Sequence, residues 1–186
     1  CSIRFEANET IFTFQCPSEP LQRTEKVKTV DFEVPPGTHG IAIDDSKMQR
    51  KLLSRILGHI GIEEGKRIVI GECSDDLFDF EGIIRRILAE EEGSCILLII
   101  DENLDYSGND GNGVIMSGSV VMKEILDKLS PIEESRLFAL VRSANDSATD
   151  VAKYMARTHG FFPKATMNKE RVREILAPLW IERYPE

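Results

Sequence analysis

Short runs of consecutive apolar residues alternate along most of the chain with longer segments in which apolar residues recur every three or four positions. The apolar runs predict strands at about residues 40–44, 67–71, 95–101, 136–142 and 159–163. The periodic segments predict helices at about residues 46–60, 76–92, 113–129, 146–157 and 168–178. In the first of these helices the apolar residues share one side, namely Met48, Leu52, Leu53, Ile56, Leu57 and Ile60.

Five strand and helix units in succession predict an α/β fold. We expect a (βα)5, doubly wound, five-stranded parallel sheet with helices on both faces. A continuous apolar strand such as Ile96 to Ile100 fits this fold, because a strand between two helical layers is buried on both sides. The ligand site of such a fold lies beyond the carboxyl ends of the strands, so those ends direct the search for function.

The first 38 residues depart from this alternation. Residues 1–17 alternate apolar and polar side chains around a turn at Asn8 and Glu9, which predicts a β-hairpin. Residues 18–38 are mostly polar and contain a Pro-Pro-Gly sequence, which is typical of a linker. We therefore expect an N-terminal hairpin, a linker, a main domain over residues 39–180 and a C-terminal tail over residues 181–186.

The composition argues against two classes of protein. The net charge is -9 and the basic residues are scattered, so we expect no nucleic-acid partner. No apolar run approaches the roughly 20 residues that span a bilayer, so we expect no membrane contact.

The four cysteines, at positions 1, 16, 73 and 95, form no CxxC pair, which favours buried free thiols in a reducing, cytoplasmic compartment. Because the chain begins with Cys and lacks a signal peptide, we expect a piece of a larger polypeptide.

Polar residues that could bind a ligand or take part in catalysis lie at the ends of four of the five predicted strands. Asp44 and Asp45 follow the first, Asp101 ends the third, Ser143 follows the fourth and Lys164 follows the fifth. Each residue alone is explained equally well as a helix cap, a turn residue or a solvated charge. Together they should converge on one edge of the sheet, where three carboxylates are tolerable mainly if they share a cation.

The ligand chemistry of this edge favours Mg²⁺, because the ligands are hard oxygens and no His or Cys is nearby. Asp101 ends the central strand and would place its carboxylate in the middle of the site. A carboxylate beside Mg²⁺ can attack a phosphoryl group to give an aspartyl phosphate. Lys164 would neutralise a phosphate oxygen, and Ser143 would donate a hydrogen bond to another.

From about Gly40 to Leu179, these residues resemble the receiver (response-regulator) domains of two-component phosphorelays, which have the flavodoxin-like fold. The resemblance is carried by "IDDS", "LLIIDENL", "ALVRSAND" and "GFFPK". It implies that Asp101 is the phosphoacceptor and that Asp45 binds Mg²⁺ directly. It also implies that Asp44 acts on the metal largely through water and that the backbone carbonyl of Asn103 completes the protein ligands.

The resemblance implies a conformational switch as well. Ser143 occupies the position of the family's switching Ser or Thr, and Phe161 that of its rotating aromatic residue. Two features depart from the family. The acceptor is followed by a long Gly- and Asn-rich segment, residues 102–113, and Ala165 stands where a Pro usually follows Lys164.

The segments "VPPGTHGIAIDDSKMQRKLL" and "IIDENLDY" are similar in sequence to receivers at the C-terminal end of hybrid sensor histidine kinases. In the opening hairpin, "ETIFTFQCP" resembles the last strands of a kinase ATP-binding domain, but an extra hairpin on the receiver itself explains it equally well. The resemblance implies partners: a histidine kinase, a histidine-containing phosphotransfer protein, or both. Met48 and Leu52 are candidate contacts for such a partner, with Leu52 favoured as a core residue. We expect a monomer or weak dimer.

The expected function is therefore to take a phosphoryl group from a phosphohistidine onto Asp101 with Mg²⁺, catalysing its own phosphorylation, and to relay it or change conformation. Two alternatives stay open. One is a receiver-like interaction module that acts without phosphorylation. The other is a Mg²⁺-dependent phosphohydrolase, although such enzymes usually carry a second Asp two positions after the nucleophile, where this chain has Asn103.

Overall fold

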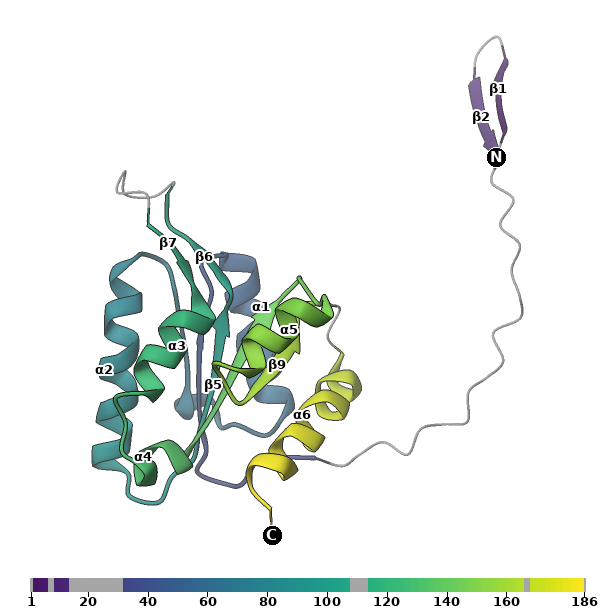
Figure 1. Cartoon of the computed structure of the whole chain (residues 1–186). Coiled ribbons are helices and arrows are strands. Elements are labelled where there is room, and N and C mark those ends of the chain that lie inside the picture. Colours follow the sequence, from purple (N-terminus) through teal and green to yellow (C-terminus); the bar gives the residue numbers. More distant parts are fainter. Residues whose placement is uncertain (1, 7–8, 14–31, 108–113, 166–167, 186) are drawn as a thin grey trace.

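The computed structural model of the chain describes residues 2–6, 9–13, 32–107, 114–165 and 168–185 (Figure 1). Its strands are β1 (Ser2–Glu6), β2 (Glu9–Thr13), β3 (His39–Ile43), β4 (Arg67–Ile70), β5 (Ile96–Asp101), β6 (Asn103–Asp105), β7 (Ile115–Ser117), β8 (Leu137–Ser143) and β9 (Gly160–Pro163). Its helices are α1 (Lys47–His59), the short 3₁₀ helix η1 (Glu64–Lys66), α2 (Asp75–Glu90), α3 (Gly118–Leu126), α4 (Pro131–Ser135), α5 (Ala148–Met155) and α6 (Lys169–Arg183).

The main sheet has five parallel strands in the order β4-β3-β5-β8-β9. This order confirms the predicted doubly wound, flavodoxin-like fold. The chain first moves from β3 to β4 on one side and then returns to β5 on the other side of β3. The winding direction therefore changes between β3 and β5, which is where folds of this type place their ligands.

Each face of the sheet carries its own hydrophobic core, because successive side chains of a strand point to opposite faces. One core joins α2, α3 and α5 to alternate strand residues, including Ile43, Ile100 and Val141. The other joins α1 and α6 to the intervening strand residues, including Ala42 and Ile99. Strands that are buried on both faces explain why their sequence is continuously apolar.

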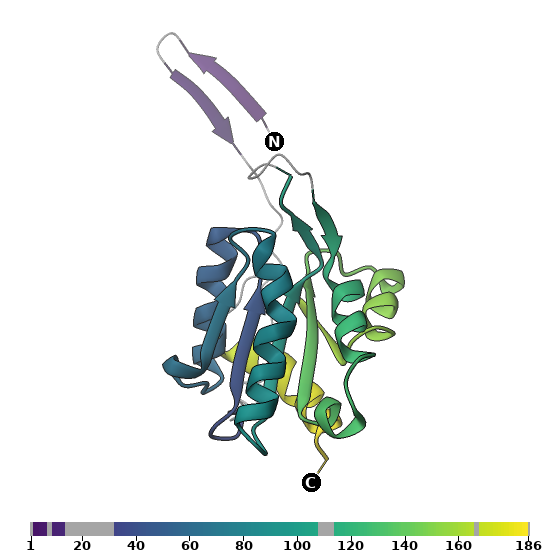
Figure 2. The same ribbon diagram turned by 90° about the vertical axis from the view of Figure 1, so that its left-hand side faces the viewer.

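A second antiparallel pair, β6 and β7, projects beyond the carboxyl end of the sheet (Figure 2). The helix predicted over residues 113–129 is therefore wrong at its start, since Ile115–Ser117 pairs with Asn103–Asp105 and α3 begins only at Gly118. Cross-strand hydrogen bonds compete successfully there with the helical periodicity of a few apolar residues. Residues 108–113, at the tip of this segment, lie outside the described residues.

Two further differences concern helices. The sequence prediction missed α4, although Ser130 and Glu133 form a capping box around its Pro131. It also ended the last helix at residue 178, whereas α6 continues through Pro178 to Arg183. The additional turn is held by Trp180, which packs on Phe138 with ring centroids 5.5 Å apart.

The N-terminal hairpin is confirmed where the structure describes it: β1 and β2 pair antiparallel from Ser2 with Thr13 to Glu6 with Glu9. Its predicted turn lies partly in residues 7–8, outside the described residues, as does most of the predicted linker. Cys73 and Cys95 are free but only partly buried, and Cys1 and Cys16 are not described. Among the described helices, none has the length and apolar character needed to cross a bilayer.

Candidate functional site

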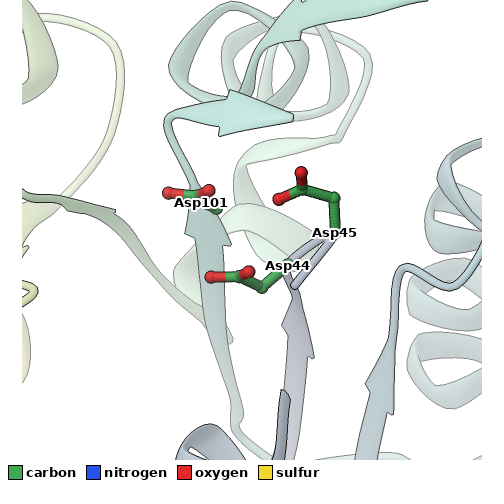
Figure 3. Close-up of side chains that lie close together, drawn as sticks. All are labelled: Asp44, Asp45 and Asp101. Atoms are coloured by element: carbon green, nitrogen blue, oxygen red, sulfur yellow. The ribbon is translucent and has the colours of Figure 1, made fainter. Parts of the chain in front are cut away.

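The carboxyl ends of β3 and β5 bring three acidic side chains together. Ile43 and Ile100 are neighbours in the parallel register, so the residues that follow them, Asp44 and Asp101, lie side by side. Asp45 follows directly, and Figure 3 shows the three carboxylates around one common space. One oxygen from each lies within 4.8 Å of the others. The ends of β3 and β5 therefore bring the three predicted carboxylates together at the change in winding direction.

Lys164 joins this acidic cluster from the end of β9. Its Nζ lies 2.7 Å from Oδ1 of Asp101 and 3.4 Å from Oδ2 of Asp44. Both carboxylates are buried, whereas Asp45 is only half-buried. Burial raises the pKa of Asp101 to about 6, against the opposing effect of Lys164, and it raises the pKa of Asp44 as well. The site thus holds its negative charge at a cost that a cation would relieve.

The loop that carries Asp44 and Asp45 is fixed by hydrogen bonds to its backbone carbonyl groups. Nη1 of Arg50 donates to the carbonyl oxygens of Asp44 at 3.1 Å, Asp45 at 2.7 Å and Gly71 at 2.9 Å. The amide of Ser46 donates to Oδ1 of Asp44 at 2.9 Å. Gly71 has a φ of +115°, and a Cβ there would overlap the backbone of Asp44. Arg50 was not singled out by the sequence analysis, because a lone Arg on a helix is ordinarily solvated.

A second close approach fixes Asp101. A Cβ on Gly118, the first residue of α3, would overlap the carbonyl oxygen of Asp101. The Gly118 amide donates to the carbonyl of Glu102 at 2.9 Å, and the Ser119 amide donates to Oε2 of Glu102 at 2.9 Å. Glu102, the residue after Asp101, therefore connects the start of α3 to the end of β5. The absence of a side chain at Gly118 lets the helix sit directly against the site.

The acidic cluster fits a divalent cation. Oδ2 of Asp44 and Oδ1 of Asp101 are buried, and Lys164 pairs with both, at 3.4 and 2.7 Å. Buried carboxylate oxygens of this kind are costly without a compensating positive charge. The donor set consists of carboxylate oxygens, which suit a hard divalent cation. The Asn103 carbonyl was also predicted to be a ligand; Asn103 begins β6, two residues past Asp101, and its role stays a prediction.

Ser143 ends β8, Phe161 lies in β9, and both contact Tyr154 of α5. Ser143 is buried, and among the described residues its Oγ accepts hydrogen bonds from the Asn145 amide at 3.1 Å and the Tyr154 hydroxyl at 3.4 Å. Tyr154 stacks on Phe161 with ring centroids 5.7 Å apart. These contacts connect the two residues predicted to form the switch. Sequence reasoning missed Tyr154, which looked like one more apolar residue of its helix.

The sequence analysis also missed Arg142, which is fully buried one residue before Ser143. Its Nη1 lies 3.6 Å from Oδ2 of Asp44 and donates to Oε1 of Gln49 at 2.9 Å. The signal was present in the sequence, because "LFALVRS" places one charged residue in an otherwise apolar strand.

The two residues considered for partner contacts on α1 differ. Met48 is 77% exposed, whereas Leu52 is partly buried and packs against the core beneath α1. The peptide bond between Lys164 and Ala165 is trans.

Comparisons with known proteins supply likenesses of fold only. No protein-family model matches the chain, and no curated protein matches it. Among solved structures, the Mn²⁺-bound form of response regulator Rcp1 is 20% identical with a TM-score of 0.44, over 80% of this chain and 94% of that one. RcsB from Salmonella enterica serovar Typhimurium, bound to promoter rprA with phosphomimetic BeF3−, is 18% identical with a TM-score of 0.47, over 76% and 67%.

A third structure, a yeast Spc42 trimeric coiled coil fused to another protein, is 16% identical with a TM-score of 0.47, over 80% of this chain and 81% of that one. We assign no function from these likenesses, because every TM-score is below 0.5 and every identity is 20% or less. What the chain itself presents is a flavodoxin-like domain with a buried acidic cluster and a lysine at the change in winding direction.

Proposed function

We propose that the chain is a phosphoaccepting receiver domain in which Asp101 takes a phosphoryl group from a phosphohistidine. The observation that carries the proposal is the grouping of Asp101 with Asp44, Asp45 and Lys164 at one end of the sheet. Asp101 lies at the end of the central strand β5, with its carboxylate held by Lys164 from one side and next to two further carboxylates.

The chemistry is a phosphoryl transfer. An oxygen of Asp101 forms a bond to phosphorus, the bond from phosphorus to the donor nitrogen breaks, and its electron pair leaves with the histidine ring, giving an acyl phosphate. Lys164 is placed to neutralise a phosphoryl oxygen, since its ammonium already lies 2.7 Å from Asp101. Ionised Asp101 is the nucleophile, so its raised pKa of about 6 still leaves it mostly reactive at neutral pH.

Mg²⁺ is the proposed cation, held by Asp44, Asp45, Asp101 and the backbone carbonyl of Asn103. When bound, it supplies charge neutralisation for the nucleophile and the phosphoryl oxygens. Small size and a preference for oxygen and water favour Mg²⁺ over larger or softer ions. Asp45, which is half-buried, is the proposed direct ligand, and Asp44 the proposed contact through water.

The proposed switch couples Ser143 to Phe161 through Tyr154. A phosphoryl group on Asp101 would attract the Ser143 hydroxyl, which now accepts from the Tyr154 hydroxyl. Movement of Ser143 would break that hydrogen bond and free the stacked pair of Tyr154 and Phe161 to repack. The surface of α5 and β9 would then change with phosphorylation.

The remaining expectations belong to the same proposal. The partners are a histidine kinase, a histidine-containing phosphotransfer protein, or both, and exposed Met48 on α1 is a candidate contact. The chain is proposed to lie in the cytoplasm and to be part of a hybrid histidine kinase, in which β1 and β2 belong either to the kinase ATP-binding domain or to the receiver. The domain is proposed to be a monomer or weak dimer.

Beryllofluoride, which mimics a phosphoryl group on a carboxylate, tests the proposal with Mg²⁺ and amide nuclear magnetic resonance. The wild-type chain should show shifted amides next to Asp101, Ser143 and Lys164. Asp101→Asn should show none of these shifts. Asp127→Asn is the matched control, because Asp127 is exposed and pairs with Lys123 on the surface of α3.

Unchanged wild-type amide spectra at saturating beryllofluoride and Mg²⁺ would contradict the proposal and favour an interaction module that acts without phosphorylation. Continuous turnover of many small phosphate esters would instead favour the phosphohydrolase. Asn103, at the position of that enzyme's second Asp, is exposed and carries no acidic group.

A further inference from the structure

Arg142 is the unusual residue of this domain, because it is a charged side chain with no exposed surface inside the central sheet. Strand alternation places it on the face that carries α1. Register places it beside Asp101, its partner on β5. Its Nη1 lies 3.6 Å from Oδ2 of Asp44 and donates to Gln49 on α1. It therefore reaches the acidic cluster from the side opposite to solvent.

The surroundings of Arg142 do not satisfy it as a purely structural residue. Its Nε and Nη2 are buried and have no hydrogen-bond partner among the described residues. A buried guanidinium with two nitrogens unpaired is costly, and nearby negative charge is what offsets such a cost. Asp44 and Asp101 supply that charge.

The charges of the site depend strongly on Arg142. When all three carboxylates are ionised, Lys164 and Arg142 together leave the site with one net negative charge. A divalent cation would make the site net positive, which suits the arrival of a doubly negative phosphoryl group. Without Arg142 the empty site would carry two negative charges, so it would attract the cation more strongly and a phosphoryl group less strongly.

We propose that Arg142 is an internal counter-ion of Asp44 that weakens binding of a divalent cation at the acidic cluster. This inference rests on the proposed cation site. The guanidinium repels the cation and competes with it for Asp44, so the cation exchanges readily and the metal-free fold is not left with unbalanced carboxylates. Arg142 acts through charge and need not contact the cation or the phosphoryl group.

Calorimetric titration of the whole chain with MgCl2 tests the proposal. Arg142→Met removes the charge and keeps an unbranched side chain, and it should bind Mg²⁺ about tenfold more tightly than wild type. Arg142→Gln is a second neutral variant in case the first does not fold. Arg142→Lys keeps the charge and should bind Mg²⁺ within about threefold of wild type.

Arg136→Met is the control for a merely structural loss. Arg136 lies at the other end of β8, where its guanidinium donates to the backbone of Leu88 and Ser94. It should melt at a lower temperature than wild type with unchanged Mg²⁺ affinity. Arg142→Met should melt lower in EDTA but gain more from saturating Mg²⁺ than wild type does.

The possible outcomes separate the two levels of the account. If the neutral Arg142 variants bind Mg²⁺ no more tightly than wild type, the role of Arg142 is overturned while the cation site stands. If they lose beryllofluoride binding with Mg²⁺ affinity unchanged, Arg142 is a phosphoryl ligand instead. If no protein binds Mg²⁺, both the inference and the proposed cation site are overturned.

Discussion

Individual residues of the acidic cluster differ in how free their charge is. Asp44 is buried between Lys164 and Arg142, 3.4 and 3.6 Å from its Oδ2, so its charge is largely balanced already. Asp45 is half-buried and forms no ion pair among the described residues. Its charge is therefore the one most available to a cation.

Mg²⁺ affinity should accordingly fall more in Asp45→Asn than in Asp44→Asn. We expect a loss of at least about tenfold for Asp45→Asn, since even the loss of a supporting residue commonly weakens metal binding by that much. Calorimetric titration with MgCl2 measures both variants. An equal or larger loss in Asp44→Asn would mean that Asp44 is the direct ligand.

His159 gives a residue-scale prediction outside the site. Its Nδ1 accepts a hydrogen bond from the Ala139 amide at 3.0 Å, so the folded state requires the unprotonated nitrogen. Burial, followed by the nearby Arg183, holds the pKa of His159 below its usual value of 6.5, against the pull of Glu134. The unfolded chain then binds a proton more readily, so the stability from His159 is full above pH 6.5 and falls as pH decreases below it.

Replacement of His159 by Asn, which keeps an acceptor for the amide, should flatten this loss of stability. Urea unfolding of both proteins at pH 5 and pH 7 measures the difference. The comparison with wild type is essential, because the raised pKa of Asp101 has the opposite effect: it favours the folded state at low pH and loses that contribution as pH rises through about 6. Identical pH dependence in the two proteins would contradict the role given to His159.

The sequence was sufficient to predict which residues belong to the candidate site where those residues lie at the ends of strands. Asp101 ends β5, Asp44 and Asp45 follow β3 and Lys164 follows β9, and the topology brings these strand ends together. Arg142 was not predictable in this way. Its role depends on which face of β8 it occupies and on its distance from Asp44, and both follow from the register with β5.

At the scale of elements, the contact between α3 and β5 limits the site most tightly. Gly118→Ala places a Cβ against the carbonyl oxygen of Asp101, so the helix or the strand end must move. We expect a loss of about 1 to 3 kcal/mol of unfolding free energy, as for other overpacking substitutions. Urea unfolding measures it, and beryllofluoride binding should weaken as well. Gly82→Ala is the matched control, because a Cβ there meets nothing within 4 Å.

If Gly118→Ala has the stability and the beryllofluoride affinity of Gly82→Ala, then α3 does not constrain Asp101. The same region shows what limited the sequence prediction. Strands buried on both faces, such as β5, are recognisable in the sequence as apolar runs, and their predicted ends lie within a residue or two of the observed ones. Short β7 has only three residues and owes its strand conformation to β6, a partner the sequence pattern did not reveal.

For the whole molecule, the binding of a cation should be linked to folding. A site that forms only when β3, β5 and β9 assemble binds Mg²⁺ in the folded state alone. Mg²⁺ at about 100 times its dissociation constant should then add about 2.7 kcal/mol of stability. Thermal unfolding in MgCl2 and in EDTA measures this gain, and Asp101→Asn should lose most of it. An equal melting temperature in MgCl2 and in EDTA would contradict a cation site in the fold.

The most direct test of the central claim is the intact mass of the chain after incubation with acetyl phosphate. With Mg²⁺, the wild-type chain should gain the mass of one phosphoryl group, and hydroxylamine should remove it, as expected for an acyl phosphate. Asp101→Asn with Mg²⁺, and wild type in EDTA, should gain none. Phosphorylation of Asp101→Asn to the wild-type extent, or of wild type equally in EDTA, would contradict Asp101 as a cation-dependent phosphoacceptor.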